Sequence, residues 1–162
     1  MHIAIISDTH SRYHTISRVL EMIGERDCGL ILHCGDIEDA EAVELFAGLP
    51  VHFVFGNCDH DRSGLRRAMK TAGVTLHEPF GDLEVDGYKI AWIHGDDAGL
   101  FRDLEHSDHF DFLFYGHTHQ TAERKTGKTL VFNPGALHRA KVKMFAVLDT
   151  ITGQLDRVVV PD

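Results

Sequence analysis

The sequence predicts an α/β protein, because strand-like and helix-like segments alternate through its first half and strand-like runs dominate its second half. Apolar, largely β-branched runs at residues 3–7, 30–32 and 51–55 are typical of buried strands. Each run is followed by a segment with apolar residues at helical spacing, and strands connected by helices tend to pair in parallel. Turn dipeptides ending in glycine separate the runs of the second half.

The helices of the first half are expected at residues 13–26, 38–49 and 63–72. In the first of them, Ile16 and Val19 begin an apolar face with the spacing of a helix. The second begins with an acidic turn, which suits the positive end of a helix dipole.

The dipeptides of the second half predict hairpin turns, since glycine accepts the backbone angles that tight turns require. They are Asp86-Gly87, Thr126-Gly127 and Thr152-Gly153. Strands are expected at residues 129–132, 144–148 and 155–160, and a short helix is expected at residues 100–105.

Composition indicates one enzyme-sized domain, residues 1–162, because 162 residues that are 43% hydrophobic can bury a single sizeable core. The net charge of −9 argues against a nucleic-acid polymer as the ligand, since binding to phosphate backbones needs clustered Lys and Arg. Cys28, Cys34 and Cys58 form no C-x-x-C pair, which favours a reducing, cytoplasmic location. No signal peptide or membrane span is expected, and a homo-oligomer is left open.

Side chains that commonly bind metal ions follow most of the strand-like runs. Open α/β sheets bind their ligands at the carboxyl ends of strands, so we expect these side chains to gather at one place. The five blocks are Asp8-Thr9-His10, Gly35-Asp36, Gly56-Asn57-Cys58-Asp59, His94-Gly95 and Gly116-His117-Thr118-His119.

The order and spacing of the blocks resemble the calcineurin-like metallophosphoesterase superfamily. Its pattern is D-x-H, then G-D, then G-N-[H/C]-[D/E], then a His with Gly, then G-H-x-H, and all five parts occur in order between residues 8 and 119. The short length, the opening M-x-I-x-x-I-S-D-T-H and the late Asn133-Pro134-Gly135 are most similar to the small stand-alone bacterial and archaeal phosphodiesterases. The resemblance implies a four-layer αββα sandwich, with two mixed β-sheets flanked by helices.

The resemblance also implies a dinuclear metal site. Seven ligands are too many for one ion, but they suffice for two ions that share a bridge. A set of Asp, His and Asn provides mixed nitrogen and oxygen donors, whereas calcium prefers oxygen donors alone. We therefore expect Mn(II) first, with Fe, Zn, Ni, Co or Mg as alternatives. By resemblance, Asp8, His10, Asp36 and His119 bind one ion, Asp36, Asn57, His94 and His117 bind the other, and Asp36 is the bridge.

Two bound ions would supply the chemistry of phosphoester hydrolysis. Metal coordination can lower the pKa of a water from 15.7 to about 7, so a metal-bridging hydroxide can serve as the nucleophile at neutral pH. The residues we assign to catalysis are Asp36, Asn57, Cys58 and Asp59, of which Asp59 resembles a residue that supports the ligands.

Two positions depart from the commonest family pattern. Cys58 stands where many members have a histidine that is thought to protonate the leaving group, and a thiol is a poor substitute, so His60 becomes a candidate for that role. Asp96 stands where the small phosphodiesterases often have another histidine, and a carboxylate there disfavours an anionic substrate unless it holds a ligand histidine in place.

The leading hypothesis is a dinuclear metal-dependent phosphodiesterase that acts on a small phosphodiester. A phosphomonoesterase is the near alternative, because the same ions can serve both reactions. A protein-interaction scaffold with the same fold is an alternative of a different class, although the intact ligand set argues against it. A DNA nuclease lacks support, since the chain is short and acidic.

Overall fold

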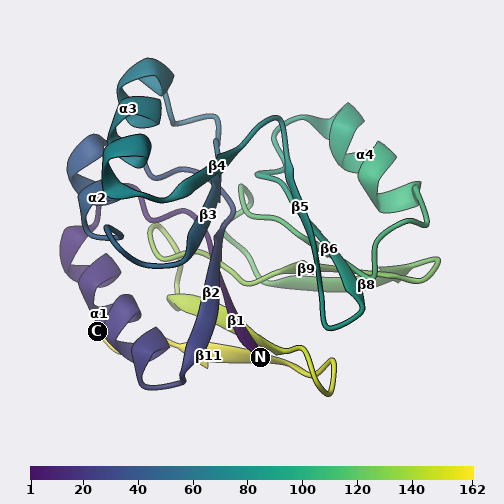
Figure 1. The fold of residues 1–162 in the computed structure, drawn as a ribbon. Coiled ribbons are helices and arrows are strands. Elements are labelled where there is room, and N and C mark those ends of the chain that lie inside the picture. Colours follow the sequence, from purple (N-terminus) through teal and green to yellow (C-terminus); the bar gives the residue numbers. More distant parts are fainter.

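The computed structural model describes residues 1–162 and has four layers, in which two β-sheets lie face to face between helices (Figure 1). Helices α1 (Tyr13–Gly24), α2 (Ala40–Glu44) and α3 (Arg62–Ala72) cover the outer face of one sheet. Helix α4 (Ala98–His106) covers the outer face of the other. The αββα sandwich implied by the family resemblance is therefore confirmed.

The first sheet has six strands in the order β11-β10-β1-β2-β3-β4. Strands β1 to β4 pair in parallel, as the alternation of strand and helix predicts, whereas β10 and β11 join as antiparallel strands. The bounds are β1 (His2–Ile6), β2 (Cys28–His33), β3 (Val51–Val54), β4 (Thr75–His77), β10 (Met144–Asp149) and β11 (Leu155–Val159).

The second sheet has five strands in the order β5-β6-β7-β9-β8. Its central strands β6, β7 and β9 are parallel, while β5 and β8 are antiparallel edge strands joined to their neighbours by hairpins at the predicted Asp86-Gly87 and Thr126-Gly127 turns. The bounds are β5 (Gly81–Val85), β6 (Tyr88–Trp92), β7 (Phe112–Phe114), β8 (Ala122–Thr126) and β9 (Thr129–Asn133).

Hydrophobic side chains fill the three spaces between the four layers. The largest cluster lies between the first sheet and helices α1 to α3 and includes Phe46 and Phe53. A second cluster around Trp92 and Phe114 joins the two sheets, and a third around Leu104 joins the second sheet to α4. Because both faces of each sheet are buried, the central strands are continuous apolar runs rather than alternating ones.

Some elements differ from the expected bounds. Helix α2 covers only Ala40–Glu44, whereas the sequence predicted a helix over residues 38–49. Glu38 has a positive φ of 79° and its N–H bonds the Asp59 side chain, so the helix begins only after the cap at Asp39. The three-residue strand β4 was not predicted, because so short a run carries little signal. No helix of the structure has the length and apolar character needed to cross a membrane.

Candidate metal centre

All five blocks lie in loops that follow strands. Asp8, Asp36 and Asn57 come after β1, β2 and β3 of the first sheet, and His94 and His117 come after β6 and β7 of the second. Since these strands are parallel within each sheet, their carboxyl ends meet at one end of the molecule. The two sheets thus each contribute part of one site.

The backbone of the site is held in a conformation that few residues adopt. Asp8, His10, Asp36, His117 and His119 all have φ between 44° and 67°, in the left-handed region. Backbone hydrogen bonds between the first two loops keep them there, with the N–H of His10 donating to the oxygen of Asp36 at 3.0 Å. Strained backbone of this kind persists where the surrounding structure fixes a functional geometry.

Two glycines let the loops approach the carboxylates closely. A Cβ at position 56 would collide with the side chain of Asp36, and a Cβ at position 116 would collide with Ser7 and Asp8. The glycines of the G-N-x-D and G-H-x-H blocks are therefore required by packing against the ligand carboxylates.

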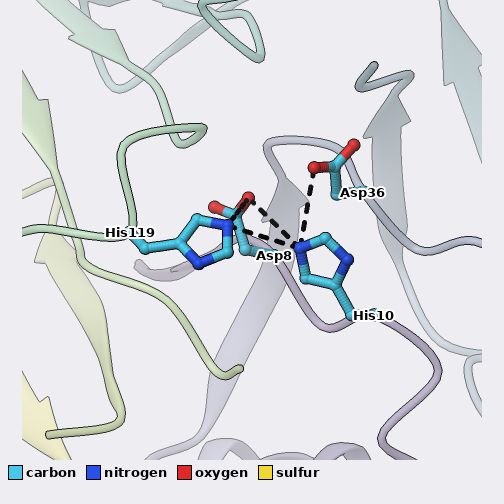
Figure 2. Close-up of side chains that lie close together, drawn as sticks. All are labelled: Asp8, His10, Asp36 and His119. Atoms are coloured by element: carbon cyan, nitrogen blue, oxygen red, sulfur yellow. Dashed lines mark hydrogen bonds and ion pairs between the residues drawn. The ribbon is translucent and has the colours of Figure 1, made fainter. Parts of the chain in front are cut away.

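The first group of ligands comprises Asp8, His10, Asp36 and His119, whose donor atoms all lie within 4.8 Å of one another (Figure 2). The Oδ1 atom of Asp8 lies 3.2 Å from Nε2 of His119, and the Nε2 atoms of the two histidines lie 3.4 Å apart. Asp8 Oδ1 is buried and has no hydrogen-bond partner. The four side chains thus point their ligand atoms at a common centre.

The second group comprises Asn57, His94 and His117 with Asp36. The Oδ1 atom of Asn57 lies 2.9 Å from Nε2 of His94 and 3.0 Å from Nδ1 of His117. His94 Nε2 also lies 3.2 Å from Oδ2 of Asp36. The structure therefore brings together all seven side chains that the sequence analysis predicts as ligands.

Asp36 stands between the two groups. Its Oδ2 atom faces Nε2 of His10 at 3.6 Å and Nε2 of His94 at 3.2 Å. Its Oδ1 atom is held by the backbone N–H of Cys58 at 2.8 Å. One oxygen is therefore anchored to the protein, and the other is directed at both groups.

The donor set fits a cation. The Nδ1 atom of His94 donates to the carbonyl oxygen of Cys34 at 2.8 Å, so Nε2 is the ring nitrogen that faces the oxygens of Asn57 and Asp36. His10 is oriented in the same way, because its Nδ1 atom lies 2.6 Å from Glu38 Oε1. Such a hydrogen bond from the second ring nitrogen is the usual companion of a metal-ligating histidine.

The electrostatics also favour positive charge at this place. Burial alone lowers the pKa of His10, but hydrogen bonds with Asp8 and Glu38 outweigh it and raise that pKa to about 9. Burial likewise opposes ionisation of Asp36, but His94 and the N–H of Cys58 lower its pKa to about 2. The buried carboxylate of Asp8 and the exposed carboxylate of Glu38 favour a proton on the His10 imidazole, and a metal ion would compete with that proton for the lone pair of Nε2.

Asp59 is buried beneath the ligands and supports them. Its carboxylate accepts three backbone N–H groups, from Gly56 at 2.7 Å, Glu38 at 2.8 Å and Asp36 at 3.0 Å. It therefore fixes the loop of the bridging carboxylate to the loop of Asn57. This geometry gives Asp59 a positioning role rather than contact with a substrate.

His33 is a supporting residue that the sequence analysis did not single out. It is fully buried, and its Nδ1 atom accepts the N–H of Gly35 at 3.1 Å, which leaves Nε2–H to donate to Thr9 Oγ1 at 3.0 Å. Thr9 in turn donates to the carbonyl oxygen of Asp36. Burial lowers the pKa of His33 to about 3, so the ring stays neutral and links the first two ligand loops.

The turn at Asn133 supports the last block. The Nδ2 group of Asn133 donates to the oxygen of Gly116 at 2.9 Å and to Thr118 Oγ1 at 3.2 Å. Asn133 therefore holds the loop that carries His117 and His119.

The two departures from the family pattern take up different places. Cys58 Sγ lies within 4.8 Å of ligand atoms of His10 and Glu38, and burial and Asp36 raise its pKa to about 11, so it is a protonated thiol at the site. His60 is exposed and forms no side-chain hydrogen bond with the site. Asp96 does not hold a ligand histidine; it is exposed in a neighbouring cavity with Asp97 and Glu78.

Comparison with known proteins agrees with this geometry. The chain is 27% identical over 155 residues to phosphodiesterase MJ0936 of Methanocaldococcus jannaschii, covering 93% of both chains. It is 31% identical over 145 residues to the probable metallophosphoesterase MJ0623 of the same organism, covering 84% of this chain and 68% of that one. A solved structure of an archaeal phosphodiesterase superposes with a TM-score of 0.89 at 25% identity, covering 98% of this chain and 99% of the other.

The family model of the calcineurin-like phosphoesterase superfamily domain matches residues 1–153, which include every ligand described above. With the fold, the two ligand groups and this match in agreement, the chain belongs to the calcineurin-like phosphoesterase superfamily.

Proposed function

We propose that this protein is a dinuclear phosphodiesterase that hydrolyses a small phosphodiester. Membership of the superfamily makes it a metal-dependent phosphoric ester hydrolase. The observation that carries the finer proposal is the position of Asp36, whose Oδ2 atom faces both ligand groups while Oδ1 is held by the backbone. A carboxylate so placed is suited to bridge two ions, and single-ion sites do not need one.

Each side chain of the site has a defined part in the proposal. Asp8, His10 and His119 hold one ion, Asn57, His94 and His117 hold the other, and Asp36 is shared. When bound, two such ions supply a water of lowered pKa and positive charge for the phosphoryl oxygens. Mn(II) is the ion we propose first, and Fe, Zn, Ni, Co or Mg are the alternatives, because mixed nitrogen and oxygen donors without a thiolate are compatible with all of them.

The choice of a diester over a monoester rests on relatives. The curated relative of similar length is named a phosphodiesterase, and so is the solved structure that superposes over nearly the whole chain.

The proposed location is the reducing cytoplasm, where cysteines such as the three of this chain remain free thiols.

The test combines metal stoichiometry with turnover. Protein stripped with EDTA is titrated with Mn(II), and hydrolysis of bis(p-nitrophenyl) phosphate and p-nitrophenyl phosphate is followed at each addition. We expect two ions per chain, no turnover without metal, and a higher kcat/KM for the diester. Activity that survives thorough chelation would refute the proposal, a preference for the monoester would favour the phosphomonoesterase alternative, and absence of turnover with two ions bound would favour the scaffold.

A further inference from the structure

A cavity of about 440 Å³ opens beside His119, next to the first ligand group. Its size lies within the range of small-molecule pockets, so it can accept a group of several heavy atoms attached to a phosphoryl centre at the ligands. His119 is both a predicted ligand and part of the cavity wall, so the cavity adjoins the first ligand group directly. Its walls come from the loop after β7 and from the segment that leads into β10. They include Gln120, Thr121, Arg139, Lys141, Val142 and Met144.

The charge of this cavity is opposite to that of the protein. Arg139 and Lys141 line it, and no carboxylate does, although the chain contains 25 acidic and 16 basic residues. Lys143 nearby pairs with Asp162 at 2.9 Å, whereas neither Arg139 nor Lys141 has a carboxylate partner. Two cations without partners at a site that already collects positive ions are suited to bind an anion.

A third cation extends the positive surface toward His10. The Nε atom of Arg12 donates to Nδ1 of His138 at 3.1 Å, and the His138 ring lies 5.3 Å from that of His10. Arg12, like the two cavity cations, has no carboxylate partner.

The opposite end of the site is acidic. A second cavity lies beside the residues that lead into Asn57 and His94 and is lined by Glu78, Asp96, Asp97 and Arg62. Glu78 pairs with Arg66 at 2.6 Å, which leaves Asp96 and Asp97 against Arg62. An anionic group is repelled there and attracted at the Arg139 end. The site therefore has a charge polarity that gives a substrate with one charged arm a single favoured orientation.

From this arrangement we propose that the cavity beside His119 binds a second anionic group of the substrate, so that the preferred substrates are phosphodiesters with a phosphate, phosphonate or carboxylate on one arm. This inference rests on the proposed function. The apolar side chains of Val142 and Met144 contact the carbon chain between the two anionic groups, and Arg139 and Lys141 bind the distal one. The side chains of Gln120 and Thr121 supply further donors.

The experiment measures binding rather than turnover, and it uses symmetric ligands so that either arm can enter the cavity. Bis(3-phosphonopropyl) phosphate carries an anionic group on both arms, and dibutyl phosphate carries none. Each is titrated calorimetrically into Mn(II)-loaded protein freed of excess metal. We expect the phosphonate to bind the wild type at least about tenfold more tightly than dibutyl phosphate, as two charge-assisted contacts imply.

A charge-matched control separates the cavity from the net charge of the protein. The double variant Arg139→Gln/Lys141→Gln should reduce the preference to less than about threefold, while Arg102→Gln/Lys125→Gln, which removes two exposed cations from α4 and β8, should retain it. If the phosphonate ligand removed Mn(II) from the protein instead of binding in the cavity, its apparent binding would change equally in both double variants. Equal preferences in the two double variants would overturn the proposal.

A further measurement needs no variant. Raising the ionic strength from about 0.05 M to about 0.5 M should shrink the wild-type preference, because the cavity cations are exposed. A wild type that binds both ligands equally at low salt would also overturn the proposal. If the proposed function is wrong, the protein will not hydrolyse bis(p-nitrophenyl) phosphate. The binding measurements do not depend on that turnover, so the two failures can be told apart.

Discussion

The support that Asp59 gives to the metal centre predicts a large effect from a very small change. Asp59→Asn keeps the size of the side chain but leaves one acceptor oxygen for three backbone N–H groups, those of Asp36, Glu38 and Gly56. At least one buried N–H then loses its acceptor and faces the new NH₂ group. An unsatisfied buried donor together with the loss of charge-assisted hydrogen bonds should lower the free energy of unfolding of the metal-free protein by about 2–4 kcal/mol.

The same variant should bind metal more weakly, since the loops of Asp36 and Asn57 lose their common anchor. Loss of a residue that orients ligands typically costs about 10- to 100-fold in metal affinity. Urea unfolding of the metal-free protein, followed by circular dichroism, measures the first effect, and calorimetric titration with Mn(II) measures the second.

Asp61→Asn is the matched control. Asp61 lies two residues further on, is exposed, and caps helix α3 by accepting the N–H of Gly64 at 2.9 Å. Because Asn caps helices about as well as Asp, this variant should leave both quantities nearly unchanged. Equal values for Asp59→Asn and Asp61→Asn would refute the reasoning.

Three further predictions concern the ligands and Cys58. Asp36→Asn should abolish binding of both ions and lower activity by several orders of magnitude, whereas excess Mn(II) should partly restore the activity of His10→Ala. If a metal titration restored the activity of both variants fully and equally, Asp36 would not be the bridging ligand. The pKa of His10 is raised from 6.5 to about 9, so its imidazolium stabilises the metal-free protein below about pH 6.5, and this stabilisation, at most about 3 kcal/mol, should be lost as the pH rises through 9. Unfolding across that range measures it, His10→Ala should remove the slope, and a flat wild-type profile would exclude the coupling. Cys58→His should selectively speed hydrolysis of diesters with poor leaving groups, by up to about 10² if position 58 reaches the leaving group; unchanged dependence on leaving-group pKa at equal metal content would point to another proton donor.

Much of the site could be predicted from sequence because its signals are local. A buried strand needs a run of apolar residues, and the ligand follows directly, as Asp8 follows Ile3–Ser7 and His94 follows the run that ends in Ile93. The glycine in a block marks where the backbone approaches a carboxylate, as Gly116 approaches Asp8. These features depend on residues adjacent in the chain.

The supporting interactions could not be predicted in the same way, because they join distant parts of the chain. His33 reaches Thr9, 24 residues away, and nothing in either local pattern indicates the contact. Glu38 was assigned to the start of a helix, yet its N–H bonds Asp59 and its carboxylate orients His10, so the helix begins later. At Glu38, contacts with distant residues of the site override the local preference for a helix, and only the folded structure shows those contacts.

The division of the ligands between the two sheets has a consequence for folding. Asp8, Asp36 and Asn57 belong to the first sheet and His94, His117 and His119 to the second, so neither sheet alone can chelate an ion as the folded chain does. Metal binding is then thermodynamically linked to docking of the sheets, and free metal stabilises the docked state in proportion to the logarithm of its concentration above the dissociation constant. A metal ion that binds at this site would thereby protect the folded chain against proteolysis, because proteases act on the opened state.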